Sequence, residues 1–255
     1  MEKIYLGTIS IVSHGHGVLL SDLLEDLQRQ EGIDQFLILL TLNIQTDIIN
    51  VRDYPQLDLQ IIENQEPKGF GANHNYAFGM ACGPIFCVLN PDIRIPVPQV
   101  LMNLLAPFSR NYQLALCAPT VLSPKGDVED SVRRNLSLFS VLSRYLGNRA
   151  SIQPREVVVR TKPFYWFAGM FLAIRAADFR DAGGFNEKFF LYCEDYDLCA
   201  KFYLAGKVLS YLPQVEVIHA AQRKSHRSLT HLRWHINSLI KVWFSKEFWQ
   251  IYLNS

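Results

Sequence analysis

The sequence has little cysteine, almost no net charge and no long apolar run. Its five cysteines are odd in number and form no Cys-x-x-Cys pair, which disfavours a disulfide framework or a thiolate zinc site and fits a reducing cytoplasm. Lys and Arg total 25 against 24 Asp and Glu, so the formal charge of +1 gives no bulk attraction to nucleic acid. The longest apolar stretches, 36–42 and 164–174, fall short of the roughly 20 residues that span a bilayer. The first ten residues do not resemble a signal peptide.

The 255 residues are 49% hydrophobic and 19% charged, which is too apolar for a disordered chain and enough for one large domain. The first half alternates short apolar runs with segments of helical spacing. Strands are expected at 4–12, 36–42, 57–62, 85–89 and 114–118, and helices at 19–27, 71–82 and 98–108. This order predicts an α/β fold, with a parallel sheet covered by helices on both faces and ligands at the carboxyl ends of the strands.

The second half has a different pattern. Helices are expected at 138–146 and 194–204, a strand at 208–211, and one or two amphipathic helices from about residue 225. No linker or repeat interrupts the chain. We therefore predict one domain over 1–224, with a nucleotide-binding half (1–118) and an acceptor half (119–224). A helical segment, 225–255, packs on that domain.

Two acidic segments are candidate sites. Asp92 ends the tripeptide Asn90-Pro91-Asp92 directly after an apolar strand, where a carboxylate can reach a metal or a phosphate-bearing ligand. An ordinary turn is the alternative. Glu194, Asp195 and Asp197 crowd three carboxylates together, which needs a compensating cation or proton and suits a general base. Acidic residues also favour a helix N-terminus without any catalytic role.

Two further features are weak by themselves. Gly69 and Gly71 precede a predicted helix, where glycines let backbone N–H groups approach a ligand. His219 ends a predicted strand at 215–218, and it can be either a ligand or a packed histidine.

In order and spacing, these segments resemble family 2 glycosyltransferases of the GT-A fold, and especially bacterial rhamnosyltransferases that build O-antigen and other surface polysaccharides. The likeness runs from Ile9 to about Lys241. It rests on residues 11–15, 69–75, 89–92, 131–134, 166–169, 184–206 and 219–235. It implies a mixed, mainly parallel sheet flanked by helices, with a C-terminal helical segment.

The resemblance implies a divalent cation, Mg²⁺ or Mn²⁺, that bridges the diphosphate of a nucleotide sugar. Asp92 would coordinate it, and His219 would lie at the metal or the diphosphate. Asn90 stands where relatives carry a carboxylate, so we expect the cation to bind weakly without nucleotide.

The nucleotide site implied by the resemblance is made of residues from several segments of the first half of the chain. Ser13 and Asn43 would line the pocket, and Gly69, Phe70, Gly71 and Asn73 would close over the nucleotide. Leu42 departs from the family, since relatives usually carry Asp there. The contact of that Asp with the base or ribose is therefore missing or supplied elsewhere, and the donor identity depends on it.

The resemblance assigns the chemistry to Asp195 as general base in an inverting displacement, with Glu194 orienting the site or touching the acceptor. Trp166 and Gly169 would lie on the acceptor side. Arg133 and Arg134 would meet the acceptor or a diphosphate. A core role for Trp166 and a solvated turn for the arginines are the alternatives.

The implied reaction moves L-rhamnose from dTDP-β-L-rhamnose to a lipid-linked glycan acceptor. A UDP- or GDP-sugar donor is the nearest rival. A nucleotidyltransferase would carry Lys or Arg in its first glycine loop, and residues 13–17 have none. An inactive sugar-binding relative would not need Asp92, Glu194 and Asp195.

The near-zero charge hides an uneven distribution. Residues 217–246 contain six Lys or Arg and no Asp or Glu, which leaves 19 basic against 24 acidic residues elsewhere. Tryptophan and phenylalanine interleave with these basic residues. A helix packed on the core is expected, with peripheral contact at the inner face of the cytoplasmic membrane or a homodimer interface as further hypotheses.

Overall fold

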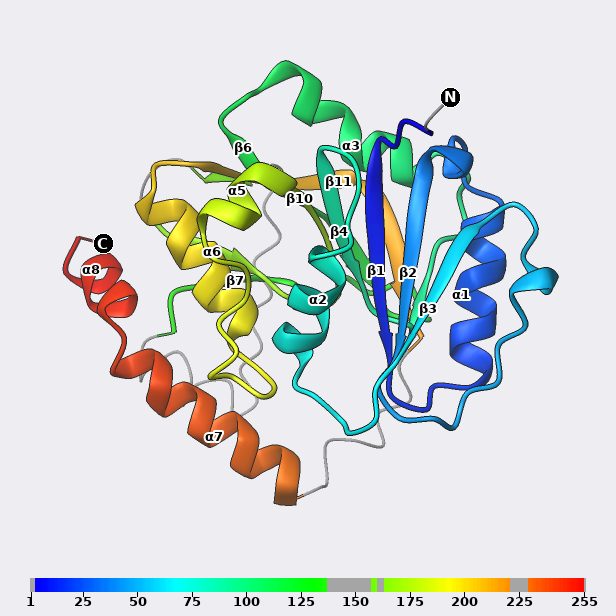
Figure 1. The fold of residues 1–255 in the computed structure, drawn as a ribbon. Coiled ribbons are helices and arrows are strands. Elements are labelled where there is room, and N and C mark those ends of the chain that lie inside the picture. The colour runs from blue at the N-terminus through cyan, green and yellow to red at the C-terminus, as the bar shows by residue number, and fades with distance from the viewer. Residues whose placement is uncertain (1–2, 137–156, 160–162, 221–228, 255) are drawn as a thin grey trace.

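The computed structural model describes residues 3–136, 157–159, 163–220 and 229–254. A nine-stranded sheet forms its centre, in the order β3-β2-β1-β4-β10-β6-β11-β5, with β8 paired to β11 (Figure 1). Its strands are β1 (Gly7–Ser13), β2 (Phe36–Leu42), β3 (Asp58–Glu63), β4 (Ile85–Leu89), β5 (Ile93–Arg94), β6 (Leu114–Leu122), β8 (Val157–Val159), β10 (Phe171–Arg175) and β11 (Val208–His219). The expected helix at 138–146 and the start of the C-terminal segment, 225–228, lie outside the described residues.

The sheet is mixed, and its parallel part is the one that the alternating pattern predicts. Strands β1 to β4 pair in parallel, as do β6 and β11. Strand β10 runs antiparallel between β4 and β6. A second, two-stranded sheet pairs β7 (Val132–Arg134) with β9 (Tyr165–Phe167). The apolar stretch 164–174 therefore supplies strands to two different sheets.

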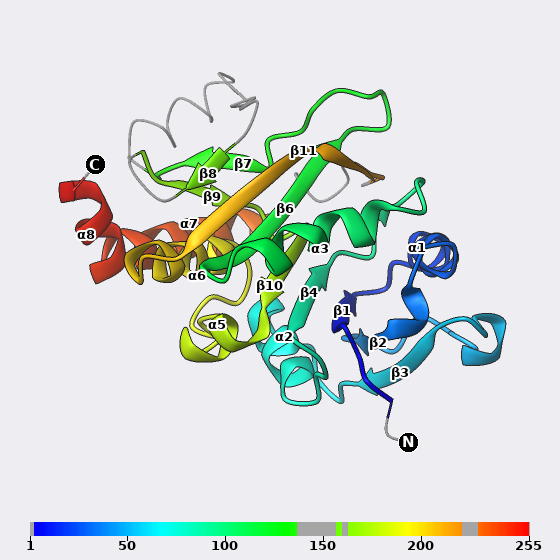
Figure 2. The same ribbon diagram turned by 90° about the horizontal axis from the view of Figure 1, so that it is seen from above.

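Helices cover both faces of the large sheet (Figure 2). They are α1 (Val18–Gln28), α2 (Phe70–Phe78), α3 (Val100–Arg110), α5 (Ala176–Asp181), α6 (Glu194–Leu204), α7 (Leu229–Trp243) and α8 (Lys246–Asn254). Alternate residues of β4 separate the two cores: Ile85, Cys87 and Leu89 pack with α1 and α3, whereas Phe86 and Val88 pack with α5 and α6. This two-residue alternation follows from the strand pleat.

Most predicted elements lie within a few residues of their observed ends, and two differ for a visible reason. Helix α2 ends at Phe78, because the N–H groups of Met80 and Ala81 bond the carbonyls three residues back, of Ala77 and Phe78, so the chain leaves the helix through tighter turns. The sequence pattern, interrupted at Pro213, predicts two strands at 208–211 and 215–218. They form one strand, β11, which continues to His219 through an irregularity between Leu212 and Glu216.

The C-terminal helices pack on the α6 side, opposite α1 and β3 (Figure 1). Leu239 and Val242 of α7 and Phe248 and Ile251 of α8 are buried in the same core as α6. None of the helices in the described part of the chain is long and apolar enough to cross a membrane.

Candidate active site

The Asn90-Pro91-Asp92 turn leaves β4 next to the loop that connects β9 with β10. The backbone N–H of Asn90 donates to the carbonyl of Met170 at 2.9 Å. The neighbouring residue Gly169 donates its N–H to Asp195 Oδ2 at 3.0 Å. One short loop therefore links the turn that holds Asp92 to the helix start that holds Asp195.

Asp92 lies beside His219, which ends β11. Asp92 Oδ2 is 3.2 Å from His219 Nε2, and Glu129 Oε2 is 2.7 Å from His219 Nδ1. Burial opposes a charged ring, but the hydrogen bonds and charges of Asp92 and Glu129 prevail and raise the pKa of His219 to about 9. A cation at His219 Nε2 would have to displace this proton.

One oxygen of the Asp92 carboxylate takes no part in the contact with His219. Asp92 Oδ1 is buried and has no hydrogen-bond partner. No group of three or more metal-ligating side chains is gathered in the described part of the chain. The donor set, a carboxylate oxygen with an imidazole beside it, therefore fits a divalent cation whose other ligands come from outside the protein.

Asp195 occupies the second position of α6 and is half-buried. Its carboxylate accepts the N–H groups of Gly169 and, at 2.9 Å, of Tyr196. Burial raises the pKa of Asp195, and the nearby charge of Arg133 and the backbone hydrogen bonds reduce this rise. The ring of Phe70 lies at the same place, because a Cβ on Gly169 would stand 3.4 Å from Phe70 and 3.7 Å from Asp195.

Glu194 is more deeply buried than Asp195. Its Oε2 has no hydrogen-bond partner. Burial and the charge of Asp195 raise the pKa of Glu194 well above its ordinary value. The pair therefore favours a protonated Glu194 next to an ionised Asp195, since two adjacent buried carboxylates rarely both ionise.

The turn before α6 is strained. Tyr192 and Cys193 have φ values of 74° and 68°, and no other non-glycine residue in the described ranges has a positive φ. Helix α7 holds this turn: Tyr192 Oη and His231 Nδ1 are 2.9 Å apart, and Ser238 Oγ donates to the Leu191 carbonyl at 2.9 Å. Sequence reasoning missed this support, because nothing in the sequence pairs residue 192 with residue 231.

The glycine turn before α2 packs against the same segment. Phe70 donates its N–H to the Phe190 carbonyl at 2.9 Å, and a Cβ on Gly69 would stand 2.7 Å from that oxygen. A Cβ on Gly71 would stand 2.7 Å from Phe185 Cβ. These glycines are needed for close packing of the turn against residues 185–190, in addition to any role at the nucleotide.

The asparagines predicted to contact the nucleotide are tied to the protein. Asn43 Oδ1 accepts from Asn64 Nδ2 and from the Lys68 N–H, both at 2.8 Å, and Asn64 Nδ2 also donates to Asn73 Oδ1 at 2.6 Å. Asn73 Nδ2 reaches the Gly69 carbonyl at 3.0 Å. Asn43 and Asn73 are buried, so in this structure they position the glycine turn.

Ser13 likewise has a partner that the sequence did not suggest. Its hydroxyl donates to Asp47, whose Oδ1 also accepts the Gly17 N–H at 2.8 Å. Asp47 comes five residues after Leu42, so a carboxylate does lie at the end of β1 although Leu42 itself is apolar and buried. The charge of Asp92 acts on the His16 ring in this loop, so the Ser13–Gly17 loop faces the Asp92 turn. The acids missed by sequence reasoning, Asp47 and Glu129, lie in loops, where only tertiary structure reveals their partners.

Trp166 is buried in the core. The Arg133 guanidinium lies 4.8 Å from the centre of its ring, and Trp166 Nε1 donates to the Arg134 carbonyl at 2.9 Å. Only 3% of Trp166 is exposed, so we expect any effect on an acceptor to pass through Arg133. Arg134 is exposed and lies over Tyr165.

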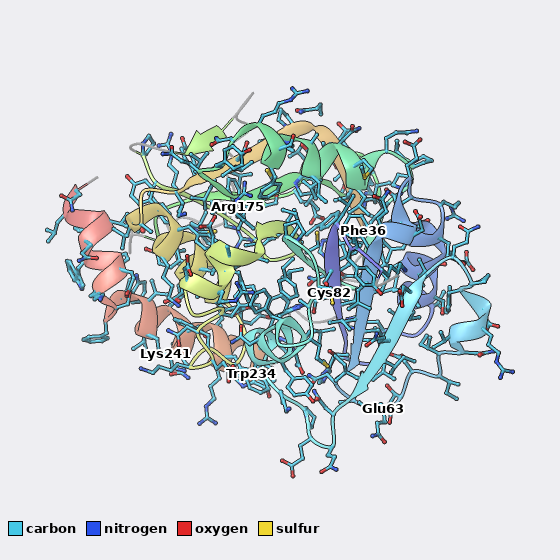
Figure 3. All side chains as sticks on the ribbon, turned by 45° about the horizontal axis from the view of Figure 1, so that its top comes forward. Phe36, Glu63, Cys82, Arg175, Trp234 and Lys241 are labelled. Carbon is cyan, nitrogen blue, oxygen red and sulfur yellow. The ribbon has the colours of Figure 1, made fainter. Side chains whose placement is uncertain are left out.

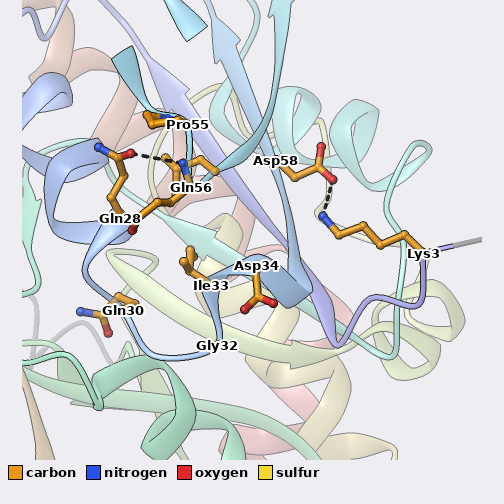
Figure 4. Close-up of a pocket in the computed structure, with 10 residues that line it drawn as sticks. Lys3, Gln28, Gln30, Gly32, Ile33, Asp34, Pro55, Gln56 and Asp58 are labelled. Atoms are coloured by element: carbon orange, nitrogen blue, oxygen red, sulfur yellow. Dashed lines mark hydrogen bonds and ion pairs between the residues drawn. The ribbon is translucent and has the colours of Figure 1, made fainter. Parts of the chain in front are cut away.

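A surface depression of about 600 Å³ lies elsewhere (Figure 4). Its lining comes from the end of α1 and from the segments that lead into β2 and β3, with Lys3 bound to Asp58 across it. It is thus at the amino ends of the parallel strands, away from Asp92 and Asp195. The chemistry-bearing residues gather at the opposite, carboxyl edge.

The chain is similar to glycosyltransferases of known sequence and structure. No family model matches the chain. Rhamnosyltransferase WbbL of Escherichia coli is 29% identical over 246 residues, which is 91% of this chain and 90% of that protein. The N-acetylglucosaminyl-diphospho-decaprenol L-rhamnosyltransferase of Mycobacterium tuberculosis is 29% identical over 160 residues, 59% of this chain and 52% of that protein.

Solved structures share the fold. Mannosyltransferase PcManGT of Pyrobaculum calidifontis, in complex with GDP-Man and Mn²⁺, has a TM-score of 0.63 and 18% identity. GalNAc-T7 with UDP, GalNAc and Mn²⁺ has a TM-score of 0.65 and 14% identity. The matches cover 92% and 96% of this chain but only 64% and 50% of those two structures. The mixed sheet flanked by helices is thus the expected fold.

Proposed function

We propose that this chain, a family 2 glycosyltransferase of the GT-A fold related to rhamnosyltransferases, transfers L-rhamnose from dTDP-β-L-rhamnose to a hydroxyl of a lipid-linked glycan in bacterial surface polysaccharide synthesis. One observation carries the proposal. Asp195 is half-buried, held by the Gly169 N–H, and joined through the 169–170 loop to the turn of Asp92. A base and a diphosphate-side carboxylate therefore flank one loop at the carboxyl edge of the sheet.

In the proposed reaction, Asp195 takes the proton of the acceptor hydroxyl as that oxygen bonds to the anomeric carbon. The bond from that carbon to the diphosphate oxygen breaks, and the nucleoside diphosphate leaves with the electron pair. A single displacement inverts the centre, so a β-linked donor gives an α-linked rhamnoside. Burial and the charge of Asp195 raise the pKa of Glu194, which favours Asp195 as the ionised member of the pair.

A divalent cation, Mg²⁺ or Mn²⁺, neutralises the charge of the departing diphosphate when it is bound. Asp92 and His219 would hold it. The buried, unpartnered Asp92 Oδ1 supports this assignment, as do the Mn²⁺ ions in two structural neighbours. Arg133 lies close enough to act on the charge of Asp195, which supports a role for it at an acceptor or diphosphate oxygen, and Arg134 is proposed to share that role.

The donor and acceptor are proposed from the relatives. Both named relatives are rhamnosyltransferases, and the mycobacterial one takes its name from a decaprenol-linked acceptor. Asp47, held beside Ser13 at the end of β1, is placed to supply the base or ribose contact that Leu42 cannot make. A UDP- or GDP-sugar donor is the alternative, since neighbours of the same fold hold these nucleotides.

A donor panel tests the proposal. Binding and slow hydrolysis are measured with dTDP-rhamnose, UDP-glucose, UDP-galactose and GDP-mannose, with Mn²⁺ present. We expect a clear preference for dTDP-rhamnose. A clear preference for another nucleotide sugar would overturn the donor while leaving the general base.

The role of Asp195 is tested by Asp195→Asn, with Asp197→Asn as the matched control. We expect Asp195→Asn to lower transfer by about 10²- to 10⁴-fold, the usual range for a general base, while nucleotide binding is kept. Asp197 pairs with Lys201 at 2.9 Å and faces away from the Gly169 loop, so its variant should keep most of the transfer rate. Wild-type turnover in Asp195→Asn would remove Asp195 from the role.

A further inference from the structure

Helix α7 carries two apolar faces, and only one of them is used by the fold. Its inner face buries Ser238, Leu239 and Val242 against the catalytic half. On its outer side, Leu232, Ile236 and Ile240 recur every four residues, and Phe244 follows the end of the helix at the same spacing, which places the four along one side. They are 44%, 47%, 44% and 86% exposed. We name these four residues the outer stripe.

Basic residues lie near the outer stripe, and Glu247 of α8 is the acidic residue that follows it in the chain. Arg233 and Lys241 lie on the helix, and Lys246 begins α8. The sequence from 217 to 246 contains no Asp or Glu. Figure 3 shows Trp234 and Lys241 on the outer edge of the molecule that α7 forms. Such a surface is complementary to an anionic one that also has an apolar interior.

Helix α8 continues the surface with aromatic side chains. Trp249, Tyr252 and Leu253 are each at least 48% exposed. Tryptophan and tyrosine prefer the boundary between lipid head groups and acyl chains, because their rings are apolar with one polar atom.

The face of α7 opposite the outer stripe packs on the segment before α6. Trp234 packs on Phe190 with ring centres 4.9 Å apart, and His231 contacts Tyr192. Phe190 and Tyr192 belong to the segment that leads into Glu194 and Asp195. A surface that binds the outer stripe is therefore separated from this segment by the width of α7.

We infer that the outer stripe, with the exposed aromatics of α8, seats this enzyme on an anionic bilayer, so that a lipid-linked acceptor reaches Asp195 from the membrane surface. The functional reason for this membrane contact rests on the proposed function, in which the acceptor is lipid-linked. The contact itself depends only on the side chains of α7 and α8.

Sedimentation of the full chain with vesicles tests this surface without donor or acceptor. The vesicles contain equal amounts of phosphatidylcholine and phosphatidylglycerol, and vesicles of phosphatidylcholine alone serve as the comparison. The test variant is Ile236→Glu with Ile240→Glu. Its control is Ile4→Glu with Tyr112→Glu, which makes the same charge change at two exposed apolar residues far from α7.

We expect the chain to bind anionic vesicles at low salt and more weakly to neutral ones. The affinity of the α7 double variant for these vesicles should fall by about tenfold or more, while the control binds like the wild type. Equal loss in both double variants, or no binding by the wild type, would overturn the inference. The inference would also be overturned if the wild type bound no vesicles and formed a dimer in sedimentation velocity while the α7 double variant was a monomer. A second copy of the chain would then cover the outer stripe.

Binding of dTDP-rhamnose, measured on the same variants, separates this inference from the proposed function. The α7 double variant should bind the nucleotide sugar like the wild type. Normal donor binding without vesicle binding would contradict only the membrane-binding surface. Vesicle binding without dTDP-rhamnose binding would contradict only the proposed donor.

Discussion

At the scale of single residues, the site is governed by the difference between two adjacent carboxyl groups. Glu194 is buried without a full set of hydrogen-bond partners, whereas Asp195 receives two backbone N–H groups. Hydrogen bonds to the ionised form favour it, and burial disfavours it. The environment therefore disfavours ionisation of Glu194 more than that of Asp195, which agrees with the proposed role of Asp195 as the base.

A substitution at Arg133 should change the pKa of Asp195. Burial raises this pKa, and the Arg133 charge lowers it, so Arg133→Gln removes a stabilising cation and should raise the pKa further. Because the base acts when deprotonated, the acid limb of the kcat/KM profile should shift to higher pH. The profile is measured with saturating cation.

Arg134→Gln is the control for that measurement. Arg134 is exposed and lies over Tyr165, so its loss should leave the acid limb in place, although KM can change. An equal shift in both variants would indicate a general charge effect. No shift in Arg133→Gln would contradict the assignment of Asp195 as the titrating base.

At the scale of elements, α7 and the turn before α6 act together. A positive φ costs a non-glycine residue on the order of 1–3 kcal/mol, and Tyr192 and Cys193 are consecutive. The surrounding contacts must stabilise such a turn, and α7 supplies His231 and Ser238 for that purpose. Helix α7 thus supports the first residues of α6 from a segment about forty positions away.

Tyr192→Phe tests this support, since it removes the hydroxyl and keeps the ring. A lost hydrogen bond is worth about 1 kcal/mol, so kcat should fall by up to about fivefold with little change in the donor KM. Tyr252→Phe, an exposed tyrosine of α8, is the control and should behave like the wild type. A lower melting temperature with unchanged kcat would mean that the bond stabilises the fold and does not position the base.

Helix α1 is fastened to the β5 segment by one buried carboxylate. Asp26 accepts from Arg94 Nε at 2.6 Å and from the Ile95 N–H at 2.9 Å. Burial alone would raise the pKa of Asp26, but these hydrogen bonds and that of Arg29 lower it overall. Asp26 therefore contributes stability that is present above the unfolded-state pKa near 4 and is lost as the pH falls through the lower folded-state pKa.

Asp26→Asn should lower the free energy of unfolding at neutral pH by about 1–3 kcal/mol, measured by urea denaturation. The difference from the wild type should shrink below pH 4. Asp22→Asn is the control, because Asp22 also pairs with Arg94 but is more exposed, and its cost should be below about 1 kcal/mol. Equal costs for the two variants would argue against the buried clamp.

At the scale of the whole molecule, the two halves of the chain meet at the proposed cation site. Asp92 comes from the first half and His219 from the second, and the protein offers few ligands of its own among the described residues. A nucleotide diphosphate would complete the set. Cation binding and nucleotide binding should then be strongly coupled.

This coupling is measurable by calorimetry with Mn²⁺. We expect weak Mn²⁺ binding by the protein alone and at least about tenfold tighter binding with dTDP present, a coupling of about 1.4 kcal/mol or more. Asp92→Asn should remove the enhancement, and a chelator should stop transfer. Tight Mn²⁺ binding without nucleotide would show that further protein ligands complete the site.

The distribution of charge is a second property of the whole chain. A formal charge of +1 conceals a basic C-terminal segment beside a more acidic body. The structure adds that part of this segment, α7, displays an apolar stripe outward with its cations. In the described part of the segment, Arg233 and Lys241 therefore share one helix with exposed apolar side chains.

The sequence by itself determined the alternating α/β half, the helix of residues 194–204 and the candidate residues Asp92, Glu194, Asp195 and His219. Local periodicity and short motifs carry that information, because a strand pleat or a helix turn involves near neighbours. The sequence also predicted that the chain is a glycosyltransferase, through the resemblance of many ordered segments.

Only the tertiary structure decided which side chains meet. Strand β10 enters the sheet against the parallel direction, Asp47 bonds with Ser13, Glu129 with His219, and α7 supports the Tyr192 turn. These pairs are separated by 34 to 90 positions, and no local preference encodes such distances. The fold brings them together because burying the apolar faces of the strands and helices leaves one arrangement, and the loops then meet where that arrangement places them.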